Sequence, residues 1–296
     1  MTQDRATGVF GKLGQAPKMI PVTLNLETSR GKKETLNYEI ARDEFLTPLL
    51  LNITIYNSLT AQERSIGEST IMIAGEIAVR GQAPVKIDRR FSSGQASQSA
   101  AGAVALPVNN LMRSRFDELE ITGIKLDLTT YDGSKTAALE RMSVDRAEVK
   151  AGDTVEIQAF ARTNSGRVFM QRIPVTIPAG TPEGEVTIKI GDGASIQKDD
   201  AIQKFIPRDL SDLIGTMNKL KMPDRLYARI FRTTTGVLVG SSEMPNLPPS
   251  MLATLNNNRM TGGVSPVTQT VVSEVEIAPA EFVISGEQTL KLMVVR

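Results

Sequence analysis

Between Ala151 and Gly193 apolar side chains recur at every second position in three successive runs. A period of two places alternate side chains on one face, which is typical of a half-buried β-strand. Asn164-Ser165-Gly166 separates the first two runs, and glycine supplies the positive φ that a tight hairpin turn needs. Three strands cannot shield their apolar face alone, so flanking sequence must add further strands. The pattern therefore predicts an antiparallel β-sandwich.

The earlier part of the chain mixes the two periods. Met19 to Leu26 and Leu36 to Ile40 alternate on either side of a turn, which indicates a hairpin. Ser69 to Arg80 and Leu119 to Tyr131 alternate as well, and Ala83 to Phe91 is the expected partner of the former. These strands are separated by helical patterns, so an α+β domain is expected here.

The segment from Asp43 to Leu59 shows the period of a helix. Its large apolar residues share one helical stripe, with Thr47 as the expected N-cap and Pro48 at the first helical position. The stripe consists of Leu46, Leu49, Leu50, Ile53 and Tyr56. The competing interpretation is a buried β-strand through Leu51 to Ile55. The helix is favoured.

Three more helices are predicted, the shortest of which starts at Pro248-Pro249-Ser250. The stretch from Ser92 is rich in small residues, and the apolar residues that follow favour a closely packed helix that is interrupted near Pro107. Asp209 to Leu220 has apolar residues at helical spacing behind Asp209 as the cap. Beyond it, strands are expected at Leu226 to Phe231 and again from Gly236 to Gly240.

The best boundary between domains is the polar turn from Asp132 to Lys135, because it separates two β patterns. We therefore expect a tail at residues 1–16, an α+β domain at 17–131, and a β-sandwich-like domain with inserted helices at 132–296. The fold class predicted for the whole chain is mainly β, with antiparallel sandwich-like domains and a few short helices.

Composition excludes several classes of function. The chain has 34 Lys+Arg against 33 Asp+Glu, so no clustered basic excess indicates a nucleic-acid partner. It has neither Cys nor His, which removes thiolate chemistry, Cys-ligated metals and the commonest general base. The longest apolar run is far shorter than the ~20 residues of a membrane span, and the start lacks a signal peptide.

Candidate chemical groups are few. Asp127, Asp132, Asp192, Asp199 and Asp200 are expected to stabilise turns, since none has the spacing of a calcium loop or an aspartic protease. Gly191-Asp192-Gly193 lacks the spacing and the following helix of a nucleotide site. Ser165 and Ser285 precede glycines outside any strand–turn–helix elbow. The sequence thus predicts no catalytic, cofactor-binding or metal-binding residue and no cofactor, although a hydrolase using carboxylates or a Ser–Lys pair stays an alternative.

Three segments carry a family resemblance: Thr2 to Val22, Asp43 to Glu68 and Ser242 to Met251. In this order they resemble the C-terminal half of large bacterial proteins with a stage IV sporulation protein B-type serine peptidase domain. Residues 7–11, Thr-Gly-Val-Phe-Gly, resemble the closing segment of that peptidase region. The family's Gly-Met-Ser-Gly-Ser-Pro motif and its catalytic His are absent here, so no catalytic residue carries over.

The resemblance implies a non-catalytic accessory region of such a peptidase, in an exported, envelope-associated parent protein. Its partner would be another protein or its own peptidase domain, with a homo-oligomer left open, and neither nucleic acid nor a membrane span is expected. The alternative is a structural or assembly β protein that self-associates through its strand edges.

Overall fold

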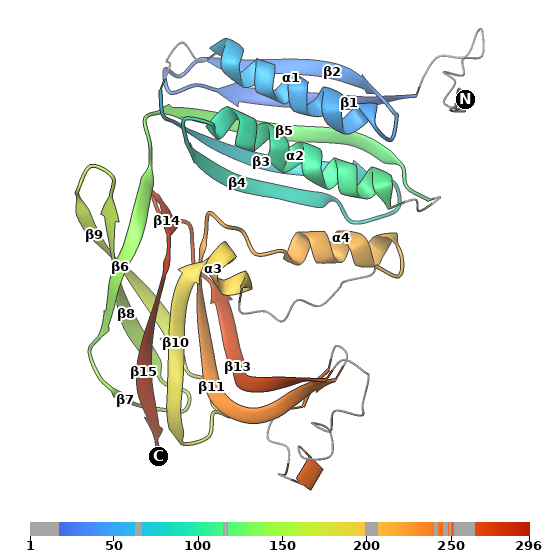
Figure 1. The fold of residues 1–296 in the computed structure, drawn as a ribbon. Helices are drawn as coiled ribbons and strands as arrows, with labels where there is room; N and C mark the ends of the chain where they lie inside the picture. Colours follow the sequence, from blue (N-terminus) through green and yellow to red (C-terminus); the bar gives the residue numbers. More distant parts are fainter. Residues whose placement is uncertain are drawn as a thin grey trace, which may run out of the picture.

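The computed structural model describes residues 18–62, 67–114, 116, 118–198, 207–239, 242–244, 248, 250–251 and 264–296. It confirms the mainly β class, with 51% strand and 22% helix. The described residues form three sheets and four helices (Figure 1). The expected tail at residues 1–16 lies outside them.

The first sheet has five strands in the order β2-β1-β5-β3-β4. Their bounds are β1 Met19–Glu27, β2 Lys33–Ala41, β3 Ser69–Val79, β4 Val85–Ser93 and β5 Ile121–Asp132. Two hairpins, β1–β2 and β3–β4, flank β5, which runs parallel to β1 and antiparallel to β3. The last strand of this region, β5, therefore lies between the predicted β1–β2 hairpin and the β3–β4 hairpin.

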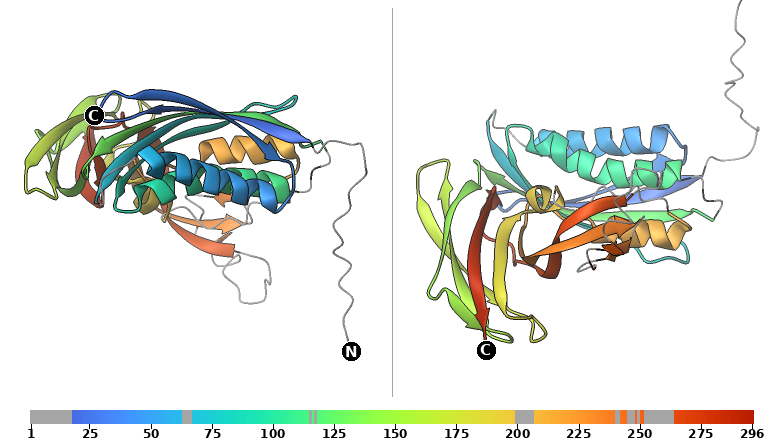
Figure 2. Two further views of the ribbon diagram at one scale, coloured as in Figure 1. Left: turned by 90° about the horizontal axis from the view of Figure 1, so that it is seen from above. Right: turned by 60° about the horizontal axis from the view of Figure 1, so that its bottom comes forward.

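Two helices, α1 (Leu46–Gln62) and α2 (Ala96–Arg113), cover the same face of this sheet (Figures 1 and 2). The small residues Ala100 and Ala101 of α2 are completely buried, which allows the close packing that the sequence indicated. The expected interruption at Pro107 is wrong, because α2 runs through it. Pro107 and Ala103 are both partly exposed, so the Ala103 carbonyl that loses its helical partner is near water.

The remaining strands form two sheets that enclose a second apolar core. One sheet has the order β14-β6-β8-β9, and the other has the order β12-β11-β10-β15-β7 with β13 also paired to β11. The first comprises β6 Thr136–Val144, β8 Thr154–Thr163, β9 Val168–Thr176 and β14 Val283–Ser285. The second comprises β7 Glu148–Lys150, β10 Gly184–Asp192, β11 Leu226–Val239, β12 Ser242–Met244, β13 Val264–Glu276 and β15 Glu287–Val295.

The three runs of the opening pattern are β8, β9 and β10. Gly166 adopts φ +84° in the turn between the first two, as the hairpin requires. Ile157, Ile173 and Ile188 point into the core between the two sheets. Within these two sheets, pairing is antiparallel except where β14 meets β6 and β15 meets β7. The two strands expected from Leu226 to Gly240 are instead one bent strand, β11, with irregular register against β13.

Two shorter helices follow β10. The first, α3 (Gly193–Gln197), begins directly after Asp192, and the second, α4 (Leu210–Lys219), has the predicted cap, since Asp209 Oδ1 accepts a hydrogen bond from Asp212 N at 2.7 Å. Leu210 and Ile214 of α4 are buried in the core of the first sheet, although the helix follows a strand of the sandwich. The α4 helix thus lies beside β4 and belongs to the core of the first sheet (Figure 1).

Candidate protein-binding surface on the first sheet

The α1 helix begins with a cap that differs from the prediction. Asp43 Oδ1 accepts hydrogen bonds from Leu46 N at 2.8 Å and Phe45 N at 2.9 Å, and these bonds lower the pKa of Asp43. Thr47 lies inside the helix, where its Oγ1 accepts from Asp43 N and donates to the Ala41 carbonyl. The expected N-cap at Thr47 is therefore wrong, and Pro48 is the third helical residue.

The apolar stripe predicted on α1 exists, but it faces outward. Leu49 is 54% exposed and Ile53 is 46% exposed, whereas Leu51, Ile55 and Leu59 fill the core. The exposed stripe also includes Leu46, Leu50 and Tyr56, with Phe45 just before the helix. No charged residue occurs between Leu46 and Gln62. A helix with large apolar residues on its buried face needs no second apolar stripe in water, so the exposed stripe indicates a surface for a partner.

Beside α1, β2 forms one edge of the five-stranded sheet. Among the described residues, β2 pairs only with β1. Hydrogen bonds from Arg42 N to Lys18 O (2.8 Å) and from Thr28 N to Lys32 O (3.0 Å) show that the even-numbered residues of β2 bond toward β1. Because this direction alternates along an antiparallel strand, the backbone groups of Thr35, Asn37 and Glu39 point outward. Such an edge is a template for another strand.

A groove of about 400 Å³ separates this edge from α1. The side chains of Leu36 and Tyr38 form its floor because even-numbered residues of β2 face the helix. Tyr38 Oη lies 3.0 Å from Ser58 Oγ, and Ser58 Oγ donates to the Thr54 carbonyl at 2.7 Å, so the polar atoms at the base are paired. The remaining lining residues are Glu34, Ile53, Asn57 and Ala61.

The opposite edge of the same sheet, β4, is closed by side chains. Lys86 N donates to Asn218 Oδ1 at 2.9 Å, and Asn218 Nδ2 donates to the Pro84 carbonyl at 3.0 Å. Arg90 N donates to Asp224 Oδ2 at 3.0 Å. The segment around α4 therefore protects β4 from further pairing, a protection that the described residues do not provide for β2.

Asp224 also belongs to the polar contact between the first sheet and the sandwich. Arg225 pairs with Asp88 of β4 and with Glu276 of β13. Burial raises the pKa of Asp224, although Arg89 Nη1 lies 4.0 Å from its carboxylate and Arg225 is also near. A buried carboxylate with a raised pKa beside arginines is a candidate functional group in general.

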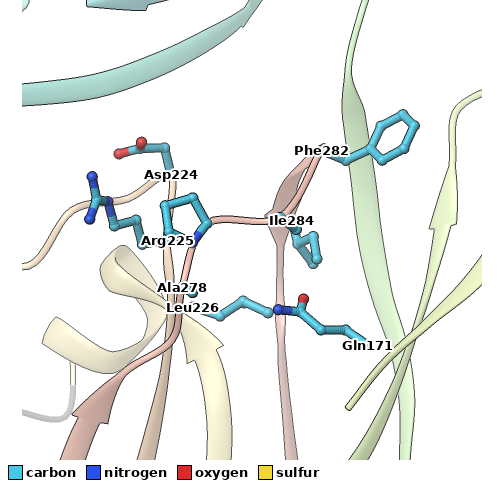
Figure 3. Close-up of a pocket in the computed structure, with 9 residues that line it drawn as sticks. Gln171, Asp224, Arg225, Leu226, Ala278, Phe282 and Ile284 are labelled. Atoms are coloured by element: carbon cyan, nitrogen blue, oxygen red, sulfur yellow. The ribbon is translucent and has the colours of Figure 1, made fainter. Parts of the chain in front are cut away.

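The space beside Asp224 decides against a substrate site there. Its cavity has a volume of about 10 Å³, which suits one water molecule. Figure 3 shows Gln171 extending from β9 toward Leu226 across this space. We therefore assign the Asp224 cluster to the contact between the two parts of the chain.

The acidic residues singled out in the sequence are dispersed. Asp192 caps α3 through Ser195 N at 2.8 Å and accepts from Gly286 N at 2.7 Å, so it stabilises turns as expected. Asp132 ends β5 and accepts from Ser29 Oγ at 3.1 Å. Asp127 lies in the middle of β5 and accepts from Asn25 Nδ2 at 2.8 Å, so the turn expected there is wrong. Asp199 and Asp200 lie outside the described residues.

Two other expectations concern short motifs. A helix does follow Gly191-Asp192-Gly193, contrary to the expectation, but α3 has only five residues. Ser165 Oγ lies 2.8 Å from Thr163 Oγ1 in the β8–β9 turn, and Ser285 ends β14.

Within the described ranges, no cluster of three or more acidic residues has the geometry of a metal site. No helix of that part of the chain is long and apolar enough to cross a membrane.

Sequence reasoning identified none of the residues that form the α1–β2 surface as functional. The absence of charge from residue 46 to residue 62 was the available signal, because solvent-facing helices normally carry charged residues. No family model, no curated protein and no solved structure matches the chain.

Proposed function

We propose that the chain is a non-catalytic accessory region that binds a protein through the α1–β2 surface. We define this surface as the outward edge of β2, the groove lined by Leu36, Tyr38 and Ile53, and the exposed stripe of α1. In a protein of the peptidase family that the sequence resembles, this region would position a substrate or another protein. The serine peptidase connection and an envelope location rest on that resemblance.

The observation that carries the proposal is the coincidence of two kinds of binding surface. The edge of β2 offers backbone hydrogen bonds, and the adjacent groove and helix offer apolar contact. Peptide-binding domains that add a strand use the same combination, in which the edge provides affinity and the pockets provide specificity. Proteins are the partners that supply both.

The surface also lies where a partner would have access. In Figure 1, β2 and α1 are at the end of the molecule opposite the sandwich. The polar contacts of Arg225, Asp224 and Asn218 hold the sandwich against the other edge of the sheet. The sandwich would then serve as a spacer that directs the α1–β2 surface away from it.

Assembly through strand edges is the second candidate function, and one observation favours β2 as that edge. Among the strands with an unpaired side in the described residues, β7, β12 and β14 have three residues each, β9 and β13 contain proline, and the edge of β4 is bonded to Asn218 and Asp224. Short strands and proline oppose edge pairing, whereas β2 has nine residues and no proline.

Photo-crosslinking from Ile53 tests the accessory function. The photoreactive residue benzoylphenylalanine is incorporated at position 53 of the protein in its natural host. Val168 of β9 is the control position, since the side chains of Ile53 and Val168 are 46% and 47% exposed. The proposal expects an adduct from position 53 that contains another protein: a peptidase region, a substrate of that peptidase or a second copy of this chain. The same adducts from both positions, or none from position 53, would overturn it.

A further inference from the structure

We infer that the α1–β2 surface binds a second copy of this chain, with β2 against β2 and α1 against α1 across a two-fold axis. This inference rests on the proposed protein-binding function and names its partner. A partner for this surface must present an extended backbone edge and an apolar helix side by side. A second copy presents both at the required spacing, and a two-fold axis brings like surfaces together.

Strand pairing across the axis would be antiparallel and would join the outward groups of Thr35, Asn37 and Glu39. In one register, Leu36 lies opposite Leu36 of the second copy, and we call this pairing centred on Leu36. It places Lys33 of each copy opposite Glu39 of the other, so two opposite-charge pairs form. Centring on Asn37 instead places Glu39 opposite Thr35 and forms no such pair. The charges of β2 therefore favour the register centred on Leu36.

The same arrangement covers the apolar residues that the isolated chain exposes. Leu36 and Tyr38 lie on the face of β2 that α1 covers, so the two grooves would meet beneath the paired helices. On α1, Ile53 lines this groove, and Leu46 and Leu50 are exposed earlier on the same helical stripe. Because α1 has no charged residue, two copies of it meet without like-charge repulsion.

The surface is large enough for a weak specific dimer. Half-exposed Leu, Ile and Tyr side chains offer roughly 80 Å² each, so five of them on each of two copies contribute roughly 800 Å² before the strand edges are counted. Specific interfaces need at least about 1,000 Å². The added strand contact brings the total to this threshold.

A membrane surface is the less favoured occupant. Helices that bind in the membrane interface carry Lys and Arg along their polar face, which attract anionic lipids. The α1 helix has no charged residue, and Arg113 is the only one in α2. Vesicles of phosphatidylserine and phosphatidylcholine are therefore a control, and the chain should not co-sediment with them.

Sedimentation velocity of the chain over a wide concentration range tests the inference. We expect a monomer that becomes a dimer as concentration rises. Ile53→Glu should shift the midpoint of this transition at least about tenfold toward higher concentration, because it places a charge in each copy at the apolar contact. Leu106→Glu is the matched control: Leu106 is 61% exposed on α2, away from the groove, and should leave the midpoint unchanged.

Cysteine crosslinking tests the register independently of Ile53→Glu. The chain contains no cysteine, so Leu36→Cys creates a single thiol. At a non-hydrogen-bonded pair, the two Cα atoms are about 4.5 Å apart, which is within the range of a disulfide. We expect a disulfide-linked dimer from Leu36→Cys on mild oxidation, and far less from Val168→Cys at the β9 edge.

The outcomes separate this inference from the proposed function. A wild-type chain that stays monomeric at every concentration, or Leu36→Cys that links no better than Val168→Cys, overturns the self-association. If photo-crosslinking from Ile53 nevertheless gives an adduct with a peptidase region, the protein-binding function stands and only its assigned partner is wrong. If the chain is monomeric and co-sediments with vesicles, and if Ile53→Glu abolishes this co-sedimentation, both the self-association and the protein-binding function are contradicted.

Discussion

Replacing Gly75 with alanine tests the close approach of β3 to β5 on which the first sheet depends. Gly75 lies in the middle of β3 with φ +154° and is paired with Leu126. A Cβ added there would lie 2.0 Å from the Lys125 carbonyl oxygen and 2.9 Å from Leu126 Cα. Both obstacles are backbone atoms, so no side-chain rotation removes the clash.

The size of the effect follows from what must move. The two strands would have to separate by about 1 Å, which weakens about two ladder hydrogen bonds worth about 1 kcal/mol each. Backbone strain at a φ that alanine rarely adopts adds about 1–3 kcal/mol. We therefore expect Gly75→Ala to reduce the free energy of unfolding by about 3–5 kcal/mol, which is exceptional for so small a substitution.

Gly102→Ala is the matched control. Gly102 lies in α2, and a Cβ at this position would meet no atom within 4 Å. Alanine is favoured over glycine by about 1 kcal/mol in a helix, so this variant should be slightly more stable than the wild type. Urea unfolding followed by circular dichroism measures both. A loss below about 1 kcal/mol for Gly75→Ala would refute the described packing of β3 on β5.

Three further predictions concern the caps and the contact between the two parts of the chain. Asn218→Ala should reduce the free energy of unfolding by about 1 kcal/mol, because it removes both bonds to the β4 edge, and Lys219→Ala, its exposed neighbour, should have little effect in the same urea titration. Asp224 has a raised pKa in the folded chain, so the folded chain binds this proton at a higher pH than the unfolded chain does. The stability of wild type relative to Asp224→Asn should therefore increase as pH falls from neutral toward 3.8, and a decrease would show that burial does not dominate the pKa of Asp224. Asp43 has a lowered pKa, so its contribution to stability is present above pH 3.8 and is lost as pH falls through the lowered value. In thermal melts at several pH values, Asp43→Ala should remove this acid sensitivity and Glu44→Ala should retain it.

The sequence was sufficient for most of the long strands and for the existence of the main helices. Alternation in β8, β9 and β10 identified them because one face of each is buried between two sheets. Asp209 was correctly placed as the cap of α4, since its carboxylate directly precedes the apolar spacing. Local patterns of this kind depend on a few neighbouring residues, and a sequence contains them in full.

The sequence could not tell which face of α1 is buried. Large apolar residues occur on both sides of this helix, so the spacing of Leu46, Leu49 and Ile53 fits the core as well as that of Leu51 and Ile55. Two residues of capping type, Asp43 and Thr47, are also four positions apart, and both take part in the cap. Tertiary packing decides between such alternatives, and local spacing does not reveal it.

The order of strands in the first sheet was also beyond local patterns. The pairing of β1 with β5 joins residues about a hundred positions apart, and it leaves β2 at the edge. The candidate surface exists because of that order and because α4, from the later part of the chain, covers the other edge. Neither contact has a signature in the sequence of β2 or α1 themselves.

Residue-resolved amide hydrogen exchange along β2 tests the central claim, that this edge binds a protein strand. In the dilute chain, the Leu36 and Tyr38 amides should exchange slowly because they bond to β1, and the Thr35, Asn37 and Glu39 amides should exchange quickly. In the concentrated chain, or in the presence of a protein that crosslinks from position 53, the three fast amides should become protected. If they stay fast in both, β2 is not a binding edge and the account is contradicted.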